Sequence, residues 1–192
     1  MKLTPLCEIA YKYRTDKCPQ IFHTYTPVYY EMFKGKDFKK VLELGIGTMK
    51  TMKHVDKYII GASLKMWRDF FPNAQIYGVD YVPEVLFEEE RIKTFLVDTR
   101  NEEELKELIK KTGSDIDLVI DDGPHNGLLQ MQTARTLMPL LDKKVIYIIE
   151  DVRSTRLIRS HLKEYDVEII RLERENNGRP MKDNNLVVIR HK

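Results

Sequence analysis

Short apolar, β-branched runs alternate along the chain with longer charged and amphipathic segments. The runs occupy residues 41–44, 76–79, 94–97, 118–120 and 145–149. Most are apolar at nearly every position, which is typical of parallel strands covered on both faces. The segments between them show helical periodicity at residues 64–71, 102–111, 128–141 and 155–165. This alternation predicts an α/β fold with a mostly parallel central sheet.

Two further β-like runs, at residues 167–172 and 186–189, behave differently from the others. The stretch between them is polar and contains Gly178 and Pro180, and no helix fits into it. Strands joined without a crossover helix pair antiparallel. We therefore expect a C-terminal antiparallel pair at one end of the sheet.

The first forty residues are rich in tyrosine and are interrupted by Pro5, Pro19 and Pro27. They should form short helices and loops that cover the sheet. The length of 192 residues suits one domain. We expect a single domain over 1–192, with 1–38 as a helical and loop lid and 39–192 as the α/β core.

Charge and apolar content exclude several classes of partner. The chain has 32 Lys and Arg against 30 Asp and Glu, so it lacks the basic excess of a nucleic-acid-binding protein. No apolar run approaches the roughly 18 residues of a membrane helix, and Pro5 and Glu8 interrupt any signal-peptide core. Two cysteines cannot build a disulfide framework. We expect a cytoplasmic protein without a nucleic-acid or membrane partner.

Glycines follow the first predicted strand, at the sheet edge where ligands bind in open α/β folds. Gly45 and Gly47 would let the backbone turn tightly and approach a ligand, although a plain strand-ending turn needs the same residues. Lys50 stands where the dinucleotide fingerprint has its third glycine, and no Walker pattern follows. The sequence therefore disfavours NAD and nucleoside triphosphates.

Single acids follow the second and third predicted strands. Asp80 could accept hydrogen bonds from both hydroxyls of a ribose, and Asp98 lies at the same sheet edge. The alternative is a pair of turn or helix-capping aspartates. An acidic edge without lysines suits a ligand that carries ribose and adenine but no phosphate.

Pairs of acids follow the fourth and fifth strands. Asp121 and Asp122 precede a Gly-Pro turn that ends at His125, and Glu150 and Asp151 follow the next strand. Adjacent like charges are costly unless a cation compensates them. Carboxylates are ligands that suit magnesium, whereas the alternative is solvated acids that cap the following helices. The spacing of His125 from Asp122 favours a functional role for the imidazole.

These motifs resemble those of the class I S-adenosylmethionine-dependent methyltransferases, and more narrowly the magnesium-dependent sugar O-methyltransferases of the macrocin and mycinamicin type. The resemblance runs from about Tyr13 to the end of the chain. The Asp-Asp-Gly-x-His element followed by Glu-Asp is its most specific part. The segments that carry it are 15–17, 23–25, 42–45, 61–67, 71–80, 121–125 and 150–151.

The resemblance implies a Rossmann-like fold with helices on both faces, and S-adenosylmethionine and Mg²⁺ as cofactors. It implies cofactor-binding roles for Glu43, Gly45, Ser63, Asp80, Asp98 and Asp121. It implies Asp122, Glu150 and Asp151 as metal ligands, with His125 as general base beside Asp122. Asp16, Lys17, His23 and Tyr25 lie in the loop-rich N-terminal segment and are candidate substrate-binding residues, because functional residues often lie on such loops. The alternative for Tyr25 is packing on the sheet.

The chain departs from the family pattern in three places. Residues 48–60 separate two glycine elements that are nearly contiguous in many relatives. Glu150 stands where some relatives carry Asp, and Pro124 where Ser is common.

The implied activity is methyl transfer to a hydroxyl of a sugar or glycosylated small molecule, which could be a free sugar, a nucleotide sugar or a glycan. Larger relatives assemble, so a homo-oligomer is one expected state. A catechol-like acceptor follows the same chemistry. A non-haem iron oxygenase is a further alternative, but it usually needs two histidines and only His125 lies near the acids. The last alternative is a domain that binds S-adenosylmethionine without turnover.

Overall fold

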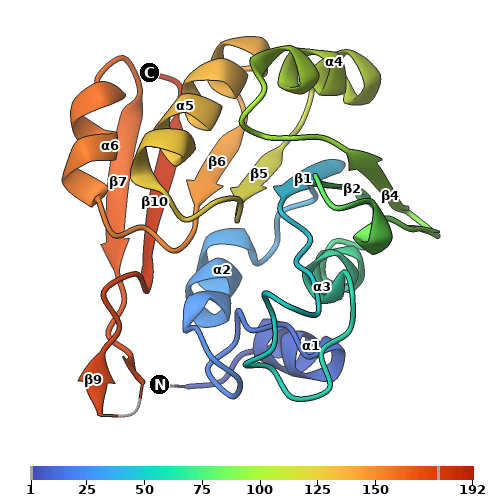
Figure 1. Ribbon diagram of the computed structural model, residues 1–192, viewed down its shortest axis with the longest axis vertical. Coiled ribbons are helices and arrows are strands. Elements are labelled where there is room, and N and C mark those ends of the chain that lie inside the picture. Colours follow the sequence, from blue (N-terminus) through green and yellow to red (C-terminus); the bar gives the residue numbers. More distant parts are fainter. Residues whose placement is uncertain (1, 177) are drawn as a thin grey trace.

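The computed structural model describes residues 2–176 and 178–192. Its centre is one eight-stranded mixed sheet that lies between two layers of helices (Figure 1). In spatial order the strands are β3 (Glu88–Glu89), β4 (Ile92–Leu96), β2 (Gln75–Asp80), β1 (Lys40–Leu44), β5 (Leu118–Asp121), β6 (Ile146–Ile149), β10 (Asn185–Arg190) and β7 (Asp166–Arg171).

Strands β4, β2, β1, β5 and β6 are parallel, as predicted. Strand β10 runs antiparallel to both β6 and β7, which confirms the predicted C-terminal antiparallel pair. The polar stretch between β7 and β10 adds a small antiparallel sheet of β8 (Glu175–Asn176) and β9 (Arg179–Pro180). The short edge strand β3 was not predicted.

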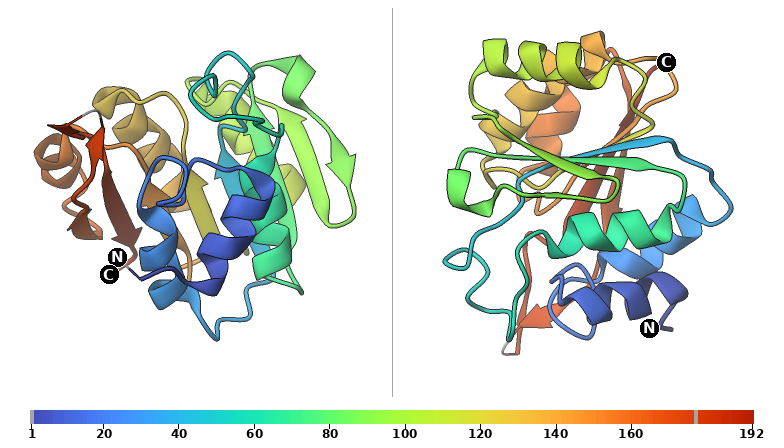
Figure 2. Two further views of the ribbon diagram at one scale, coloured as in Figure 1. Left: turned by 90° about the horizontal axis from the view of Figure 1, so that it is seen from below. Right: turned by 90° about the vertical axis from the view of Figure 1, so that its right-hand side faces the viewer.

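Helices cover both faces of the sheet, and Figure 2 shows the three layers. One face carries α1 (Pro5–Tyr13), α2 (Tyr25–Phe33) and α3 (Ala62–Phe70). The other face carries α4 (Glu102–Thr112), α5 (Gly127–Leu137) and α6 (Thr155–His161). The short 3₁₀ helices η1 (Pro83–Val85) and η2 (Met138–Leu140) lie between these elements. Among the described residues, no helix is long and apolar enough to cross a membrane.

The alternation of strand side chains produces a separate hydrophobic core on each face. On β5, Leu118 and Ile120 belong to the core that holds Trp67 of α3, whereas Val119 belongs to the core that holds Leu137 of α5. Successive strand residues point to opposite faces, so a strand between two helical layers must be apolar throughout. This requirement explains the uninterrupted apolar runs of the sequence.

Two predicted helices end earlier than expected. Pro139 has no amide hydrogen to continue the ladder of α5, so the chain turns into η2 after Leu137. Helix α6 ends at His161, because Leu162 leaves the helical backbone conformation and is buried in the core instead. Both changes lie away from the carboxyl edge of the parallel strands.

Candidate active site at the carboxyl edge of the sheet

A cavity of 1280 Å³ opens at the carboxyl ends of the parallel strands. The N-terminal segment between α1 and α2 and the residues that follow β9 also line it. Ten of the predicted site residues contribute to its wall. They are Asp16, Lys17, His23, Gly45, Ser63, Asp80, Asp98, Asp122, His125 and Asp151.

Four predicted site residues do not line this cavity: Glu43, Tyr25, Asp121 and Glu150. All four are buried behind its wall. The Glu43 carboxylate accepts a 2.8 Å hydrogen bond from the Trp67 indole, and Asp121 accepts one of 2.7 Å from Tyr147. Burial raises the pKa of Glu43 to about 7 and that of Asp121 to about 6. Direct contact of these acids with the cofactor stays a prediction.

Asp80, at the end of β2, fixes the conformation of the loop after β1, which contains Gly45 and Gly47 and is called the glycine loop below. One carboxylate oxygen accepts hydrogen bonds from the amides of Ile46 (3.0 Å) and Gly47 (3.3 Å), and the other from Val82 (3.0 Å). Gly45 has a φ of +94°, and a Cβ added there would lie 2.3 Å from the Asp122 carbonyl oxygen. Glycine is therefore required where this loop passes over the end of β5.

Two further predicted residues lie on the same side of the cavity. Ser63 stands in the first turn of α3 and is almost fully buried. Asp98 forms a bidentate ion pair with Arg100, at 2.8 Å from Nε and 2.6 Å from Nη2. The side-chain hydrogen bonds from Arg100 lower the pKa of Asp98.

Residues 48–60 form a loop that the sequence identified only as an insertion. The Tyr58 hydroxyl donates a 2.9 Å hydrogen bond to the carbonyl of Ile46, which ties the loop to the strand end of β1. The sequence of this loop has no periodicity that predicts a functional role, yet five of its residues line the cavity. They are Thr48, Thr51, Met52, His54 and Tyr58.

The ends of β5 and β6 bring Asp122, His125 and Asp151 together. One ligand atom from each residue can be chosen so that all lie within 4.8 Å of one another. His125 Nε2 lies 3.3 Å from Asp122 Oδ1 and 3.2 Å from Asp151 Oδ2. Helix α5 begins directly after this turn, where the Asn126 side chain caps it by accepting hydrogen bonds from two amides.

The carboxylates of this cluster change the pKa of the His125 imidazole. Burial alone would lower the pKa of His125, but the hydrogen bond and charge of Asp122, together with Asp151, raise it to about 9. Without a metal ion the imidazole is therefore protonated at neutral pH. The two carboxylates attract a positive charge into the space between them.

Lys17 is the buried cation of the site. Its ammonium donates to Asp122 Oδ2 at 2.6 Å and to Glu150 Oε2, and it lies 3.5 Å from Glu43 Oε1. Burial alone would lower the pKa of Lys17, but these three carboxylates raise it well above its usual value. Tyr29 donates to the other oxygen of Glu150. Lys17 thus joins the ends of β1, β5 and β6, and its contact with substrate stays a prediction.

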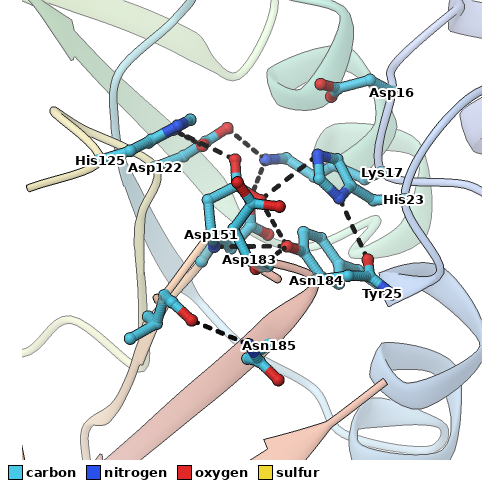
Figure 3. A network of polar contacts seen from close by, with 12 residues as sticks. Asp16, Lys17, His23, Tyr25, Asp122, His125, Asp151, Asp183, Asn184 and Asn185 are labelled. Atoms are coloured by element: carbon cyan, nitrogen blue, oxygen red, sulfur yellow. Dashed lines mark hydrogen bonds and ion pairs between the residues drawn. The ribbon is translucent and has the colours of Figure 1, made fainter. Parts of the chain in front are cut away.

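His23 and Tyr25 approach Asp151 from the N-terminal segment (Figure 3). Their rings stack with centroids 4.7 Å apart, and the Tyr25 hydroxyl donates to Asp151 Oδ1. His23 Nε2 lies 3.3 Å from the same oxygen, and Nδ1 lies 3.1 Å from Asn184 Oδ1. The Asn184 amide nitrogen donates to Thr24, so its oxygen faces His23 and Nδ1 carries the hydrogen. Sequence reasoning missed Asn184, since a single asparagine before a strand carries no pattern.

No family model matches the chain. It is 36% identical over 149 residues to 8-demethyl-8-(2-methoxy-alpha-L-rhamnosyl)-tetracenomycin-C 3'-O-methyltransferase of Streptomyces olivaceus. It is 34% identical over 151 residues to mycinamicin VI 2''-O-methyltransferase of Micromonospora griseorubida. Each match covers 77% of this chain and 36% of the relative. The chain therefore spans little more than a third of the length of these curated relatives.

Solved structures show the same relationship. The MycE methyltransferase from the mycinamycin biosynthetic pathway, in complex with Mg, SAH and mycinamycin VI, has a TM-score of 0.67 at 31% identity. That match covers 80% of this chain and 39% of the other. Another MycE structure, with Mg and SAH, has a TM-score of 0.73 at 25% identity, over 99% of this chain and 55% of the other. The chain has the class I methyltransferase fold and resembles the mycinamicin-type sugar O-methyltransferases.

Within this fold the buried charge of Lys17 makes a testable contribution to stability. Replacing Lys17 with methionine leaves buried carboxylates without a cation, so the free energy of unfolding is expected to fall by about 3–5 kcal/mol. Urea denaturation measures this change. Lys12→Met is the control, because Lys12 is exposed and pairs with Asp69 at the surface, and it should leave the free energy of unfolding nearly unchanged.

If Lys17→Met does not fold, a second variant still tests the role of Lys17. Lys17→Met combined with Glu150→Gln removes one of the uncompensated carboxylates, so it should recover part of the lost stability. A Lys17→Met variant as stable as the wild type would contradict the assignment of Lys17 as the counter-charge of the site.

Proposed function

We propose that the chain transfers a methyl group from S-adenosylmethionine to a hydroxyl of a sugar or glycosylated small molecule, with the help of Mg²⁺. One observation carries this proposal: Asp122, His125 and Asp151 converge at the strand ends beside the glycine loop that Asp80 holds open. The names of the relatives, which are sugar O-methyltransferases, support the choice of acceptor.

The residues of the cluster fit a magnesium ion. Asp122 and Asp151 offer carboxylate oxygens from adjacent strand ends, and hard oxygen ligands suit this cation. The two carboxylates already raise the pKa of the imidazole that lies beside them, which supports their attraction for a cation. The metal, when bound, would lower the pKa of a coordinated hydroxyl and orient it. Glu150 as a third ligand stays a prediction, since its carboxylate accepts hydrogen bonds from Tyr29 and Lys17.

The residues around Asp80 suit the cofactor. S-adenosylmethionine carries a ribose and no phosphate, and the glycine loop lies between Asp80 and the end of β5. Each carboxylate oxygen has two acceptor positions, and Asp80 uses three of the four on backbone amides. It therefore keeps acceptor capacity for a ribose hydroxyl. Asp98 and Ser63 line the same part of the cavity.

His125 would act as the general base. Its side chain lines the cavity and is 49% exposed, and Nε2 lies beside the carboxylates of Asp122 and Asp151, where the acceptor hydroxyl would be held. Binding of a metal by the two carboxylates would remove the attraction that raises the pKa of the imidazole. The imidazole can then accept the proton of the acceptor hydroxyl. The oxygen forms a bond to the methyl carbon as the carbon–sulfur bond breaks, and S-adenosylhomocysteine (SAH) leaves.

A direct assay tests the proposal. The protein is incubated with S-adenosylmethionine, Mg²⁺ and separate acceptors, and SAH and methylated products are measured by mass spectrometry. We expect SAH to form with at least one sugar. SAH formed with a catechol and with no sugar would establish the non-sugar alternative instead. Tight cofactor binding without any turnover would indicate a binding domain.

A further inference from the structure

The cations that line the cavity fall into two groups. The cations of the first group lie near Asp122, His125 and Asp151, or near Asp80 where we propose that the cofactor binds, and they are paired with carboxylates. Arg100 pairs with Asp98 at 2.6 Å, and Arg153 pairs with Asp183 at 2.7 Å. The histidines at positions 23, 54 and 125 and Lys17 also lie within 4.0 Å of an acid.

Arg179 and Lys182 form the second group. Both line the cavity and both are exposed. Within residues 2–176 and 178–192, neither has a carboxylate partner within 4.0 Å, although Asp183 follows Lys182 directly and pairs with Arg153 instead. These two are thus the cavity cations whose charge no described acid balances.

The topology places these two cations away from the cofactor side. The sheet order puts β2 and β1 on one side of β5 and β6, and β10 and β7 on the other. Arg179 and Lys182 belong to the connection between β7 and β10, which extends beyond the sheet in Figure 1. The cavity therefore extends from the glycine loop beside Asp80, past Asp122 and Asp151, to the connection between β7 and β10.

If the methyl donor binds near Asp80 and the metal binds at Asp122 and Asp151, the end of the cavity at the β7–β10 connection is left for the acceptor. We propose that Arg179 and Lys182 bind a negatively charged group, a phosphate or a carboxylate, on the sugar acceptor. This inference rests on the proposed function, which defines the acceptor end. A guanidinium can bind either group through two hydrogen bonds, and an ammonium adds a point charge beside it.

Binding calorimetry tests the inference. The probes are glucose 1-phosphate, glucuronic acid and methyl glucoside, titrated in the presence of SAH and EDTA so that no metal contributes. The wild type should bind one or both anionic sugars at least about tenfold more tightly than methyl glucoside, since only the anionic sugars can form charge-assisted hydrogen bonds with the two cations. Comparison of the phosphate with the carboxylate identifies which group is recognised.

The double variant Arg179→Gln/Lys182→Gln should lose this preference. The matched control is Arg159→Gln/Lys163→Gln, which removes the same charge from exposed residues on and after α6 and should keep it. Equal binding of the neutral probe, undetectable binding of both anionic probes, or a preference that survives in the double variant would overturn the inference.

A parallel turnover assay separates this inference from the proposed function. Methylation of methyl glucoside at the rate of the anionic sugars, unchanged in the double variant, would refute the charge recognition and leave the methyltransferase proposal standing. Conversely, an anion preference that depends on Arg179 and Lys182, without methylation of any sugar, would support the anion site and refute the proposed reaction.

Discussion

Replacing His125 with alanine is expected to lower the rate of methyl transfer by about 10²–10⁴-fold, the usual loss when a general base is removed. The imidazole lines the cavity and lies within 3.3 Å of Asp122 and Asp151, the two carboxylates that we propose bind the metal. Initial rates of SAH formation at saturating substrate measure the effect. The loss should be partly recovered at high pH, where hydroxide can take the proton.

Calorimetry with Mg²⁺ and S-adenosylmethionine provides the control for this variant. Both should bind as they do in the wild type, because Asp122, Asp151 and the Asp80 loop remain. If Mg²⁺ affinity instead falls tenfold or more, His125 is a metal ligand and not the base. Full activity of His125→Ala would exclude both roles, and a metal-independent methyltransferase would then fit better.

Removal of divalent metal with excess EDTA is expected to abolish turnover. A sugar hydroxyl is a weak nucleophile at neutral pH, and the proposed metal would lower its pKa. S-adenosylmethionine should remain bound, because none of its predicted contacts is one of the predicted metal ligands. Added Mg²⁺ should also raise thermal stability, by about 2.7 kcal/mol at one hundred times its dissociation constant.

Two variants identify the ligands in this experiment. Asp151→Asn should lose both the Mg²⁺-dependent stabilisation and the activity. Glu150→Gln decides the role of Glu150: a matching loss of Mg²⁺ affinity would establish it as a third ligand, whereas wild-type affinity would restrict it to binding Lys17. Undiminished turnover in EDTA would contradict the metal mechanism altogether.

The central strands could be predicted closely because burial on both faces demands continuous apolar sequence. Strands β1, β2, β5 and β6 lie within two residues of their predicted bounds. Strand β4, which lies next to the edge strand β3, begins two residues earlier than predicted, because the exposed Lys93 separates the buried Ile92 from the apolar run. Strands β8 and β9 are polar and only two residues long, so apolar periodicity could not reveal them.

The site was predictable in its location but not in the direction of every side chain. Acids after successive parallel strands must meet at one edge, and Asp80, Asp122 and Asp151 do so. Neighbouring residues of an extended chain point in opposite directions. Asp121 therefore lies behind the wall while Asp122 lines the cavity. After β6 the chain leaves the extended conformation, since Asp151 has a φ of +53°, and there Glu150 is buried while Asp151 lines the cavity.

The partners of these acids could not be predicted either. Lys17 reaches Asp122 and Glu150 across 105 and 133 residues of sequence, and Asn184 reaches His23 across 161. A lone lysine or asparagine in a loop gives no signal of such contacts. Only the docking of the N-terminal segment onto the strand ends brings these side chains together.

The same long separations determine when the site can form during folding. The contacts of Lys17 with Asp122 and Glu150, of Tyr25 with Asp151 and of His23 with Asn184 each close a loop of more than one hundred residues. The entropic cost of closure rises with loop length. Folding of such non-local arrangements is slow. We expect the sheet and its local helices to form first and the segment around residues 15–25 to dock afterwards. Until it docks, the carboxylates of the strand ends lack their lysine and repel one another, so the catalytic arrangement is completed only in the last stage of folding.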